Sequence, residues 1–567
     1  MIHPSPAIVS EHAARRLPRP ALLLVCLVYV LAGFLWREPW KSADMMALGY
    51  MLELAHGMSP WFEPQIMGAA DPAGALLPYW LGAWAVQWAP PWINPALASR
   101  VPFAFLLAMA LASTWYATYH LARRSEAQPV AFAFGGEAAP ADYARAVADG
   151  ALLAIMACLG LAQLSHETTP ALAQLSFGAL ALFGMAALSR QSALASVCLL
   201  LGLLGLALSG APALALLMAL AHLGLRCLEY GRSGAGSEAQ ADAPHWQTTA
   251  IAALVCLATL ALVLGMGLWQ NRLRSLGATL DEARSFARLM LWFTWPAWPL
   301  ALWTVWRWRR HIPALHIGLP LAIVLLILGS TAFAGGSDRS LLLALPALAV
   351  LAAFALPTLK RSVSAFIDWF TLLFFTGCAA LVWLYWIAMQ TGSPPRMAAS
   401  VAKLTPGFQP SFQGLAFVLA LGASLVWLWL VKWRVGRHQK AIWTSLVLPA
   451  SGAALCWLLL MTLWLPMLDY ARSYAPLVRR ISSVIGHPAC VQVHGLTPAQ
   501  NAAFRYHGKL DTRPGTRQAS CAWLLVNAQN LASLEQSIDA SQWIRHGVFR
   551  RPADKDEDIL LYKRHGG

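Results

Sequence analysis

The sequence predicts an all-α membrane protein that crosses the bilayer many times and ends in a small α/β domain. Hydrophobic residues make up 58% of the 567 residues and charged residues only 12%, whereas soluble domains contain about 45–50% apolar and about 25% charged residues. Apolar runs long enough to cross a bilayer as a helix, which takes about 20 residues, recur along the chain, and polar residues become common again after about residue 467. Only a lipid bilayer offers room to bury so much apolar surface.

The basic residues set the expected orientation. Arg15, Arg16 and Arg19 precede the first apolar run, so segment 1–19 is expected in the cytoplasm. No small-residue cleavage site follows that run, which is therefore not expected to be a cleaved signal peptide. About thirteen spans are expected, at 20–36, 97–121, 146–164, 170–188, 193–209, 212–228, 247–269, 289–306, 313–333, 340–359, 365–389, 413–431 and 441–465.

The count of thirteen depends on segment 75–90, which is apolar enough to be a further span. If it crossed, every later basic cluster would lie outside; if it stays at the interface, all of them lie inside, as is usual for Lys and Arg. Pro78, Pro90 and Pro91 also suit an interrupted helix. Residues 20–466 are then the transmembrane domain, with a long external loop of juxtamembrane helices at 37–96, and residues 467–567 form an external domain.

The external tail has the pattern of a small α/β domain. Segments 490–494, 521–526 and 559–563 resemble strands, and 498–507 resembles a helix with Pro498 near its start. Cys490 and Cys521 open two of these strands, and in an oxidising compartment they are expected to form a disulfide, two free thiols being the alternative. The other cysteines lie in apolar runs, and no metal-binding Cys or His spacing is present.

An acidic residue, Asp44, follows the first expected span, in WREPWKSADMMALGYMLELAHG. Residues 45–56 have the pattern of an amphipathic helix, so the simplest interpretation is that Asp44 caps its N-terminus.

The order of motifs around Asp44 resembles the GT-C glycosyltransferases, in the branch of the protein O-mannosyltransferases and the bacterial transferase that adds aminoarabinose to lipid A. That family has an acidic residue after the first span, a juxtamembrane helix, a P…G…KPPL.YWL pattern and an Arg that opens the second span. Matching positions here are Asp44, Trp61, Pro64, Gly68, Pro78–Leu81 with Tyr79, and Arg100, followed by Phe293–Arg310 and Arg339–Val350. The thirteen spans and the external C-terminal domain also fit this branch.

The resemblance implies a bacterial inner-membrane enzyme with its active site at the periplasmic face and its C-terminal domain in the periplasm. Asp44 would be the catalytic residue. The donor would be a sugar on a polyprenyl phosphate, such as undecaprenyl phosphate, and the acceptor lipid A, another glycan or a protein. Five family positions differ: Met45 replaces the second carboxylate, Gly74, Ala75 and Leu76 replace the Lys and the two prolines of KPPL, and Ser340 replaces the Tyr of the later segment. These replacements leave open a member that binds a lipid-linked glycan without catalysis.

Positive charge outside the membrane is a second candidate feature. Lys and Arg normally avoid short external loops, and Arg suits bidentate phosphate binding. The expected substrate-binding set therefore includes the external cations, namely Arg37, Lys41, Arg272, Arg274, Arg284, Arg288 and Arg339, beside Tyr79 and Arg100 from the family pattern. Alternatives are binding of membrane-lipid head groups and pairing with Asp281 and Glu282. Despite the net charge of +15, no nucleic-acid partner is expected, because no basic-aromatic surface module is present.

His166 and Glu167, at the external end of the third expected span, are the last candidates. They are expected to contact substrate or a metal, or, more simply, to belong to a solvated loop before Pro170. No cofactor is firmly expected, although a divalent metal stays open, and phosphate-loop and dinucleotide motifs are missing from the sequence. A lipid-glycan transporter is the main rival class, but the sequence shows no clear internal repeat and few charges within the spans.

Overall fold

The computed structural model describes residues 5–232, 245–269, 280–333, 338–435, 441–486, 488–517, 520–551, 553–554 and 557–565. They form two compact units. The first unit comprises Met1–Gly33, Phe103–Ala379 and Ala420–Leu458; the second comprises Phe34–Pro102, Ala380–Leu419 and Leu459–Gly567. Each unit therefore gathers segments that are far apart in the sequence.

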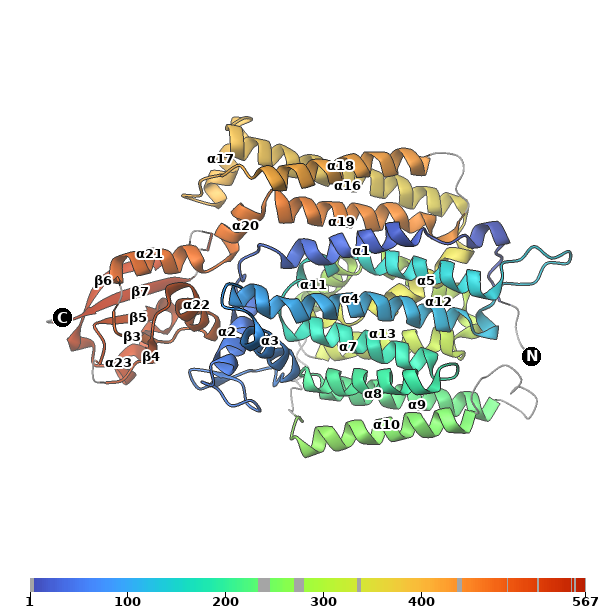
Figure 1. The fold of residues 1–567 in the computed structure, drawn as a ribbon, viewed down its shortest axis with the longest axis horizontal. Helices are drawn as coiled ribbons and strands as arrows, with labels where there is room; N and C mark the ends of the chain where they lie inside the picture. Colours follow the sequence, from blue (N-terminus) through green and yellow to red (C-terminus); the bar gives the residue numbers. More distant parts are fainter. Residues whose placement is uncertain are drawn as a thin grey trace. The chain divides into compact units, whose positions relative to one another are not determined.

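The helices and strands run in the order shown in Figure 1. The helices are α1 (Arg19–Phe34), α2 (Ala43–Ala55), α3 (Leu77–Trp88), α4 (Pro95–Ala122), α5 (Pro140–Ala157), α6 (Leu161–Leu164), α7 (Pro170–Ala187), α8 (Ser192–Leu208), α9 (Pro212–Arg232), α10 (His245–Gly265), α11 (Leu280–Phe293), α12 (Ala297–Arg307), α13 (Leu315–Phe333), α14 (Asp338–Leu342), α15 (Leu345–Ala355), α16 (Arg361–Thr391), α17 (Pro395–Leu404), α18 (Gly414–Val435), α19 (Val447–Thr462), α20 (Leu465–Arg472), α21 (Ala475–Ile485), α22 (Pro498–Gly508) and α23 (Leu534–Ser537). The strands are β1 (Gln65–Ile66), β2 (Ala69–Ala70), β3 (Val491–His494), β4 (Thr512–Pro514), β5 (Trp523–Asn527), β6 (Trp543–Arg550) and β7 (Asp558–Arg564).

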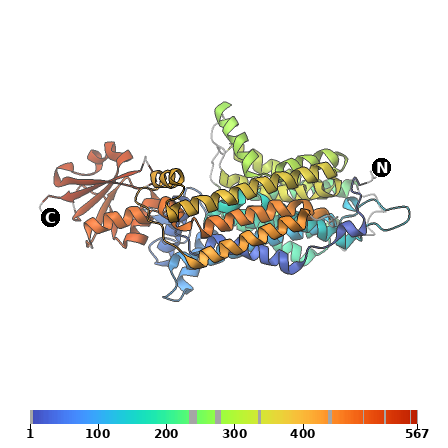
Figure 2. The same cartoon turned by 90° about the horizontal axis from the view of Figure 1, so that it is seen from above.

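The first unit is a bundle of apolar helices that lie side by side, as Figures 1 and 2 both show. Its closest helix pair, α7 and α8, approaches backbone to backbone. A Cβ atom on Gly184 would lie 2.5 Å from the Leu199 nitrogen, and one on Gly202 would lie 2.4 Å from the Ala181 nitrogen. Small residues permit this approach, which is the usual basis of helix association in lipid.

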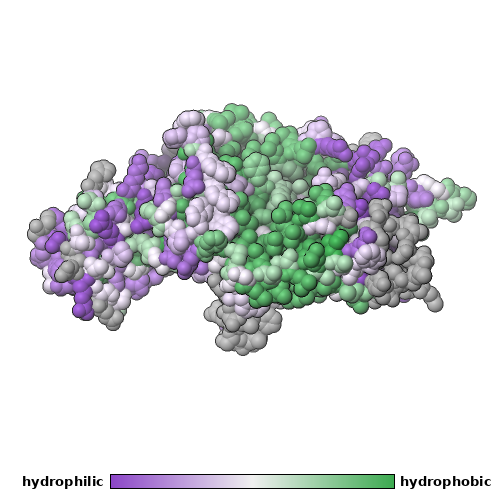
Figure 3. All heavy atoms as spheres, turned by 60° about the horizontal axis from the view of Figure 1, so that its bottom comes forward, coloured by the Kyte–Doolittle hydropathy of each residue, from purple (hydrophilic) through white to green (hydrophobic). Residues whose placement is uncertain are grey.

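Nine helices of the described residues are long and apolar enough to cross a membrane, and two shorter apolar helices cover Ala193–Leu208 and Leu345–Thr358. Their outer faces are apolar: on α10, Leu254, Leu257 and Leu264 are all exposed, Leu254 by 67%. Figure 3 shows hydrophobic residues gathered over the long helices on the face that it presents. A lipid-facing helix needs such a surface, because its neighbours are acyl chains rather than water. The expected all-α membrane fold is thus confirmed, whereas the count of thirteen spans stays a prediction.

Three expected spans are interrupted. Segment 146–164 is divided between α5 and α6, segment 289–306 between α11 and α12, and segment 340–359 between α14 and α15. Proline accompanies two of the breaks, since Pro296 directly precedes α12 and Pro346 lies in the first turn of α15. A proline cannot donate the backbone hydrogen bond that would continue a helix.

Segment 75–90 forms α3, whose 12 residues rise about 18 Å. This rise is less than the roughly 30 Å thickness of the hydrocarbon core of a bilayer.

The second unit carries the C-terminal α/β structure. A five-stranded sheet has the order β4-β3-β5-β7-β6, with β3 parallel to β4 and β5, and β7 antiparallel to β5 and β6. The strands β3, β5 and β7 and the helix α22 occupy the segments that the sequence predicts. Edge strands β4 and β6 do not appear among the predicted strands, because β4 has three residues and β6 exposes most of its side chains.

Helix α22 connects this sheet to the segment that follows α1. Its start is fixed by a capping box between Thr497 and Gln500. Its middle lies against α2, where a Cβ on Gly49 would fall 2.5 Å from the Cβ of Ala502. A glycine in α2 thus lets the two helices meet closely, and the C-terminal sheet is held to the segment that contains Asp44.

Cys490 and Cys521 form a disulfide that joins the starts of the neighbouring segments of β3 and β5. We expect Cys490→Ser or Cys521→Ser to destabilise the tail by about 3 kcal/mol, because the crosslink closes a loop of 31 residues and restricts the unfolded chain. Proteolysis of the tail in the purified full-length protein should become faster. Cys227→Ser, at an exposed free cysteine, is the matched control, and equal rates for all three variants would contradict the prediction.

Candidate functional site

Asp44 lies at the start of α2, directly after the segment that leaves α1. Helix α2 begins at Ala43 with Ser42 as its N-cap residue, so Asp44 is inside the first turn rather than at the cap. The expectation that it caps the helix is therefore wrong by two positions. Its carboxylate instead turns back toward the preceding segment, where Oδ2 accepts a hydrogen bond from the Trp40 backbone N–H at 3.2 Å.

Two guanidinium groups accompany this carboxylate in the interior of the second unit. Arg37 donates from its terminal nitrogen to Asp44 Oδ2 at 3.0 Å, and the two side chains are 0% and 2% exposed. Arg100, at the start of α4, lies 3.9 Å from the same oxygen and donates to the backbone carbonyl oxygen of Arg37. The three predicted residues thus meet in one buried cluster. Arg37 also stacks over the Trp40 ring, with its guanidinium carbon 4.6 Å from the ring centroid.

A second carboxylate, Asp469 in α20, belongs to the same cluster. Its Oδ1 accepts hydrogen bonds from the Trp40 indole at 2.7 Å and from the Glu38 backbone N–H at 3.2 Å. Burial raises the pKa of Asp469 to about 6, although these hydrogen bonds lower it in part. We did not predict Asp469 from the sequence. The available signal was its position, since it follows the last expected span as Asp44 follows the first.

The cluster has the chemistry of an anion and proton site. Arg37 and Arg100 bring two fixed positive charges, Asp44 brings one negative charge, and Asp469 can change its charge near pH 6. Guanidinium groups suit phosphate oxygens, and a buried carboxylate beside them can orient or accept the proton of a hydroxyl group. Two carboxylates and two guanidinium groups are thereby held together in the interior.

Two other predicted residues of the second unit lie in different surroundings. Lys41 pairs with Asp554 at 2.5 Å and Glu557 at 2.9 Å, so it anchors the C-terminal segment. Tyr79 is buried in α3 against the Tyr50 ring, with 5.0 Å between centroids, and burial together with the nearby Asp71 carboxylate raises its pKa well above the usual value. Both contacts are those of structural residues.

The predicted residues of the first unit form their own contacts. Glu167 pairs with Arg339 at 2.8 Å. His166 is completely buried; its Nε2 lies 2.9 Å from the Tyr29 carbonyl oxygen and its ring centroid 4.9 Å from that of Trp457. The solvated-loop interpretation of His166 is therefore wrong, because the ring packs against α1 and α19. Gly33 permits this packing, since a Cβ there would fall 2.3 Å from the imidazole.

The predicted arginines near α11 are only partly described. Arg284 and Arg288 lie on exposed positions of this helix, and Arg284 pairs with Asp281 at 3.7 Å while both side chains stay more than three-quarters exposed. Such an exposed pair contributes little to stability. Because its side chain is 77% exposed, Arg284 stays accessible to solvent and to ligands. Arg272 and Arg274 lie outside the described residues.

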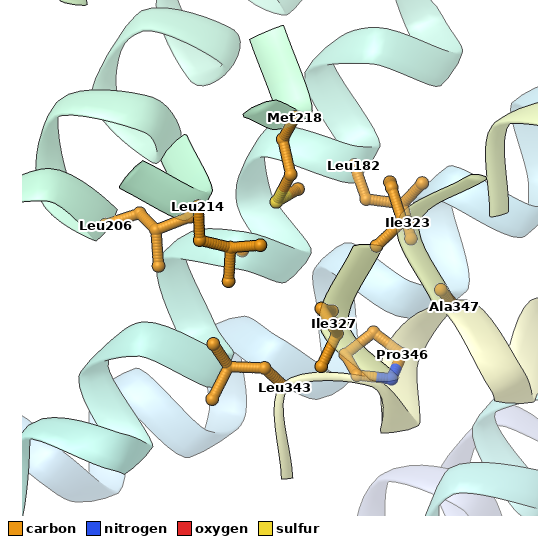
Figure 4. Close-up of a pocket in the computed structure, with 10 residues that line it drawn as sticks. Leu182, Leu206, Leu214, Met218, Ile323, Ile327, Leu343, Pro346 and Ala347 are labelled. Atoms are coloured by element: carbon orange, nitrogen blue, oxygen red, sulfur yellow. The ribbon is translucent and has the colours of Figure 1, made fainter. Parts of the chain in front are cut away.

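The described residues of the first unit form a small apolar pocket but no cluster of metal-binding side chains. Within the described ranges, no group of three or more His, Cys, Asp or Glu side chains is placed to hold a metal ion. A small pocket between α7, α8, α9, α13 and the start of α15 is lined by apolar side chains such as Leu182, Met218 and Ile327 (Figure 4). It offers no polar group to a phosphate or a sugar.

We expect Arg37→Gln to lower the free energy of unfolding by about 3–5 kcal/mol, because it leaves the buried Asp44 carboxylate without its main partner. Thermal unfolding of the purified protein would measure the loss. Arg513→Gln removes an exposed pair with Asp511 and should cost less than about 1 kcal/mol. Adding Asp44→Asn to Arg37→Gln should restore part of the lost free energy of unfolding. If the effects of the two substitutions are strictly additive, the energetic coupling between Arg37 and Asp44 is contradicted.

A pH dependence should follow from Asp469. Because its pKa is raised in the folded protein to about 6, ionisation is harder when folded than when unfolded, so stability should fall as the pH rises from about 4 to 6. Asp469→Asn should remove about 2–3 kcal/mol of this fall. Unfolding midpoints of both proteins between pH 4 and 7 would test it, with Asp511→Asn at an exposed carboxylate as control. Parallel pH profiles for wild type and Asp469→Asn would refute the assignment.

Comparisons with known proteins agree at the level of fold. No known family profile matches the sequence, and no curated protein matches it. Two solved structures match nearly the whole chain: ArnT from Cupriavidus metallidurans bound to undecaprenyl phosphate, at a TM-score of 0.60 and 14% identity, and the same protein in the apo state, at 0.58 and 13%. Each match covers 96% of this chain and 97% of the other. The chain thus has the fold of ArnT, the lipid A aminoarabinose transferase of the GT-C class, and the resemblance predicted from the sequence is confirmed as a likeness of structure.

Proposed function

We propose that this protein transfers a sugar from a polyprenyl-phosphate donor, such as undecaprenyl phosphate sugar, to an acceptor at the periplasmic face of a bacterial inner membrane. The acceptor is lipid A, another envelope glycan or a protein. In this proposal the N-terminus is cytoplasmic and residues 467–567 are periplasmic. A lipid-linked donor is physically reasonable, because nucleotide sugars stay in the cytoplasm and do not reach an external site.

The observation that carries the proposal is the buried cluster of Asp44, Arg37 and Arg100 directly after α1. Charged side chains are expensive to bury, so an ionisable cluster held in the interior is a candidate functional site. The similarity of the whole fold to a protein with undecaprenyl phosphate bound supports the same ligand class here.

The reaction would be a direct displacement with inversion at the anomeric carbon. An acceptor oxygen attacks this carbon, the bond between the carbon and the phosphate oxygen breaks, and polyprenyl phosphate leaves with the electron pair. Asp44 orients the acceptor hydroxyl and takes its proton. Arg37 and Arg100 stabilise the charge on the departing phosphate. Where the acceptor is itself a phosphate, no proton needs to be removed and Asp44 only positions it.

The remaining predicted residues have narrower roles in this proposal. Arg284, Arg288, Arg272 and Arg274 attract the anionic head group to the membrane surface, as external arginines do. Arg339 and Glu167 form a pair in the first unit, and His166 packs there. No divalent metal is needed for the displacement as written, and a metal dependence stays open.

A non-catalytic binder of lipid-linked glycans is the second candidate. Two observations favour it. Asp44 already binds the Arg37 guanidinium and the Trp40 N–H, and Met45 and Gly74 replace two polar family residues. Such a protein would bind polyprenyl phosphate tightly and release no product. A transporter would instead move the lipid-linked glycan across the membrane without forming a glycosidic bond.

Mass spectrometry of lipid A and other envelope glycans would test the transferase. Cells that lack the gene should lose a sugar-sized mass, wild type should restore it, and Asp44→Asn should lower the product at least about a hundredfold, as is typical for a lost acid–base group. Asp511→Asn, at an exposed carboxylate of the same unit, is the matched control.

Folding has to be separated from catalysis in this experiment. Each variant should be purified and its unfolding midpoint compared with that of wild type. Full product formation by a folded Asp44→Asn protein would remove Asp44 from the mechanism. Unchanged glycans in all strains, together with tight polyprenyl-phosphate binding by the purified protein, would establish the non-catalytic binder instead.

A further inference from the structure

A cavity of about 850 Å³ opens entirely within the second unit. It is lined by Glu38 from the segment after α1, by the C-terminal end of α2, by the turn at Pro91–Pro95 and by the C-terminal end of α22. Its volume lies in the range of about 300–1,000 Å³ that is usual for ligand sites. Except for Pro95, the first residue of α4, its lining lies outside the candidate membrane spans.

The walls of the cavity are held by contacts between distant parts of the chain. Arg505 of α22 pairs with the buried Glu53 of α2 and also donates to the Thr512 hydroxyl at 2.9 Å. Tyr506 donates its hydroxyl hydrogen to the Asn94 side-chain oxygen at 2.6 Å. The Arg505–Glu53 and Tyr506–Asn94 contacts both join the first loop to the C-terminal domain, so they hold the walls of the cavity together.

The lining mixes polar with apolar side chains, carries both signs of charge and includes an exposed aromatic ring. Glu38 and Lys509 contribute opposite charges, and Trp92 is 84% exposed.

This chemistry distinguishes between classes of ligand. An isoprenyl chain needs an apolar cavity, whereas these walls carry five charged side chains, from Glu38, Glu53, Arg505, Lys509 and Asp511. A bare phosphate needs an excess of cations, but these five side chains comprise three carboxylates and only two basic groups. A sugar ring presents hydroxyl groups along its edge and C–H groups on its face, which suit mixed polar groups and an aromatic surface respectively.

We propose that this cavity binds the saccharide part of the acceptor, an inference that rests on the proposed transferase function. The cavity is connected to the Asp44 cluster through Glu38, whose backbone N–H donates to Asp469. Asp469 in turn accepts from the Trp40 indole, and the Trp40 N–H donates to Asp44. A saccharide held beside Glu38 is thereby connected to the proposed base, Asp44, through the hydrogen bonds of Asp469 and Trp40.

Saturation-transfer NMR on the purified full-length protein, with no donor present, would test the cavity by itself. The probes are maltose, a soluble glucosamine disaccharide and inorganic phosphate. We expect at least one disaccharide to bind and phosphate not to displace it. Trp92→Ala should weaken that binding at least about tenfold, as expected for the loss of an aromatic platform. Trp88→Ala is the matched control, because Trp88 is 81% exposed in nearby α3 and does not line the cavity.

Three results would overturn the inference: no disaccharide binds, phosphate competes for the site, or Trp88→Ala and Trp92→Ala weaken binding equally. The last result would identify Trp92 as one of several interfacial tryptophans. The outcomes are separable from failure of the proposed function. If saccharide binding depends on Trp92 but the cellular glycans are unchanged, the cavity is assigned and the transferase function is refuted. If the glycans change but no saccharide binds, the transferase function stands and the cavity assignment is refuted.

Discussion

The burial of the Asp44 carboxylate between Arg37 and Arg100 is the constraint on which the second unit depends. Taking these charges out of water costs several kcal/mol for each ion, and mutual pairing repays that cost only when the geometry is good. The cluster joins the segment after α1, the first turn of α2 and the start of α4. A change in any one of the three side chains therefore disturbs the relative placement of three chain segments.

The C-terminal domain is attached to the same place by a second set of polar contacts. Asp469 binds the Trp40 indole, Lys41 binds Asp554 and Glu557, and Arg505 binds Glu53. Each contact joins the first loop to a residue more than 400 positions later in the sequence. The close approach of α22 to α2 at Gly49 adds apolar packing to these contacts. The first loop and the C-terminal domain consequently form one structural unit, and a site in that unit draws residues from both.

Apolar helix faces and charged groups serve different substrates in the proposed reaction. The long helices present leucine-rich faces suited to acyl chains, whereas the cluster of Asp44, Arg37 and Arg100 and the cavity beside Glu38 belong to the second unit. A reaction between a lipid-linked donor and a hydrophilic acceptor needs both kinds of surface, because neither substrate is stable in the surroundings that the other prefers. The titration of Asp469 near pH 6 adds a proton-accepting group to the polar side.

The sequence by itself determined the class of fold, because an excess of apolar residues in long runs can be buried only in lipid. It also located Arg37 as a cation outside the expected spans, whereas Asp44 and Arg100 became candidates through the resemblance of the motif order to the GT-C glycosyltransferases. Strands β3, β5 and β7 were predictable as short segments rich in Val, Leu and Ile within a polar tail. Tertiary structure alone decided which candidates meet: Asp469 joined Asp44, Lys41 turned to the C-terminal segment, and His166 entered the packing of α1 and α19. The physical reason is that hydrophobic periodicity is a local property, whereas the partner of a buried charge is chosen by packing between residues hundreds of positions apart.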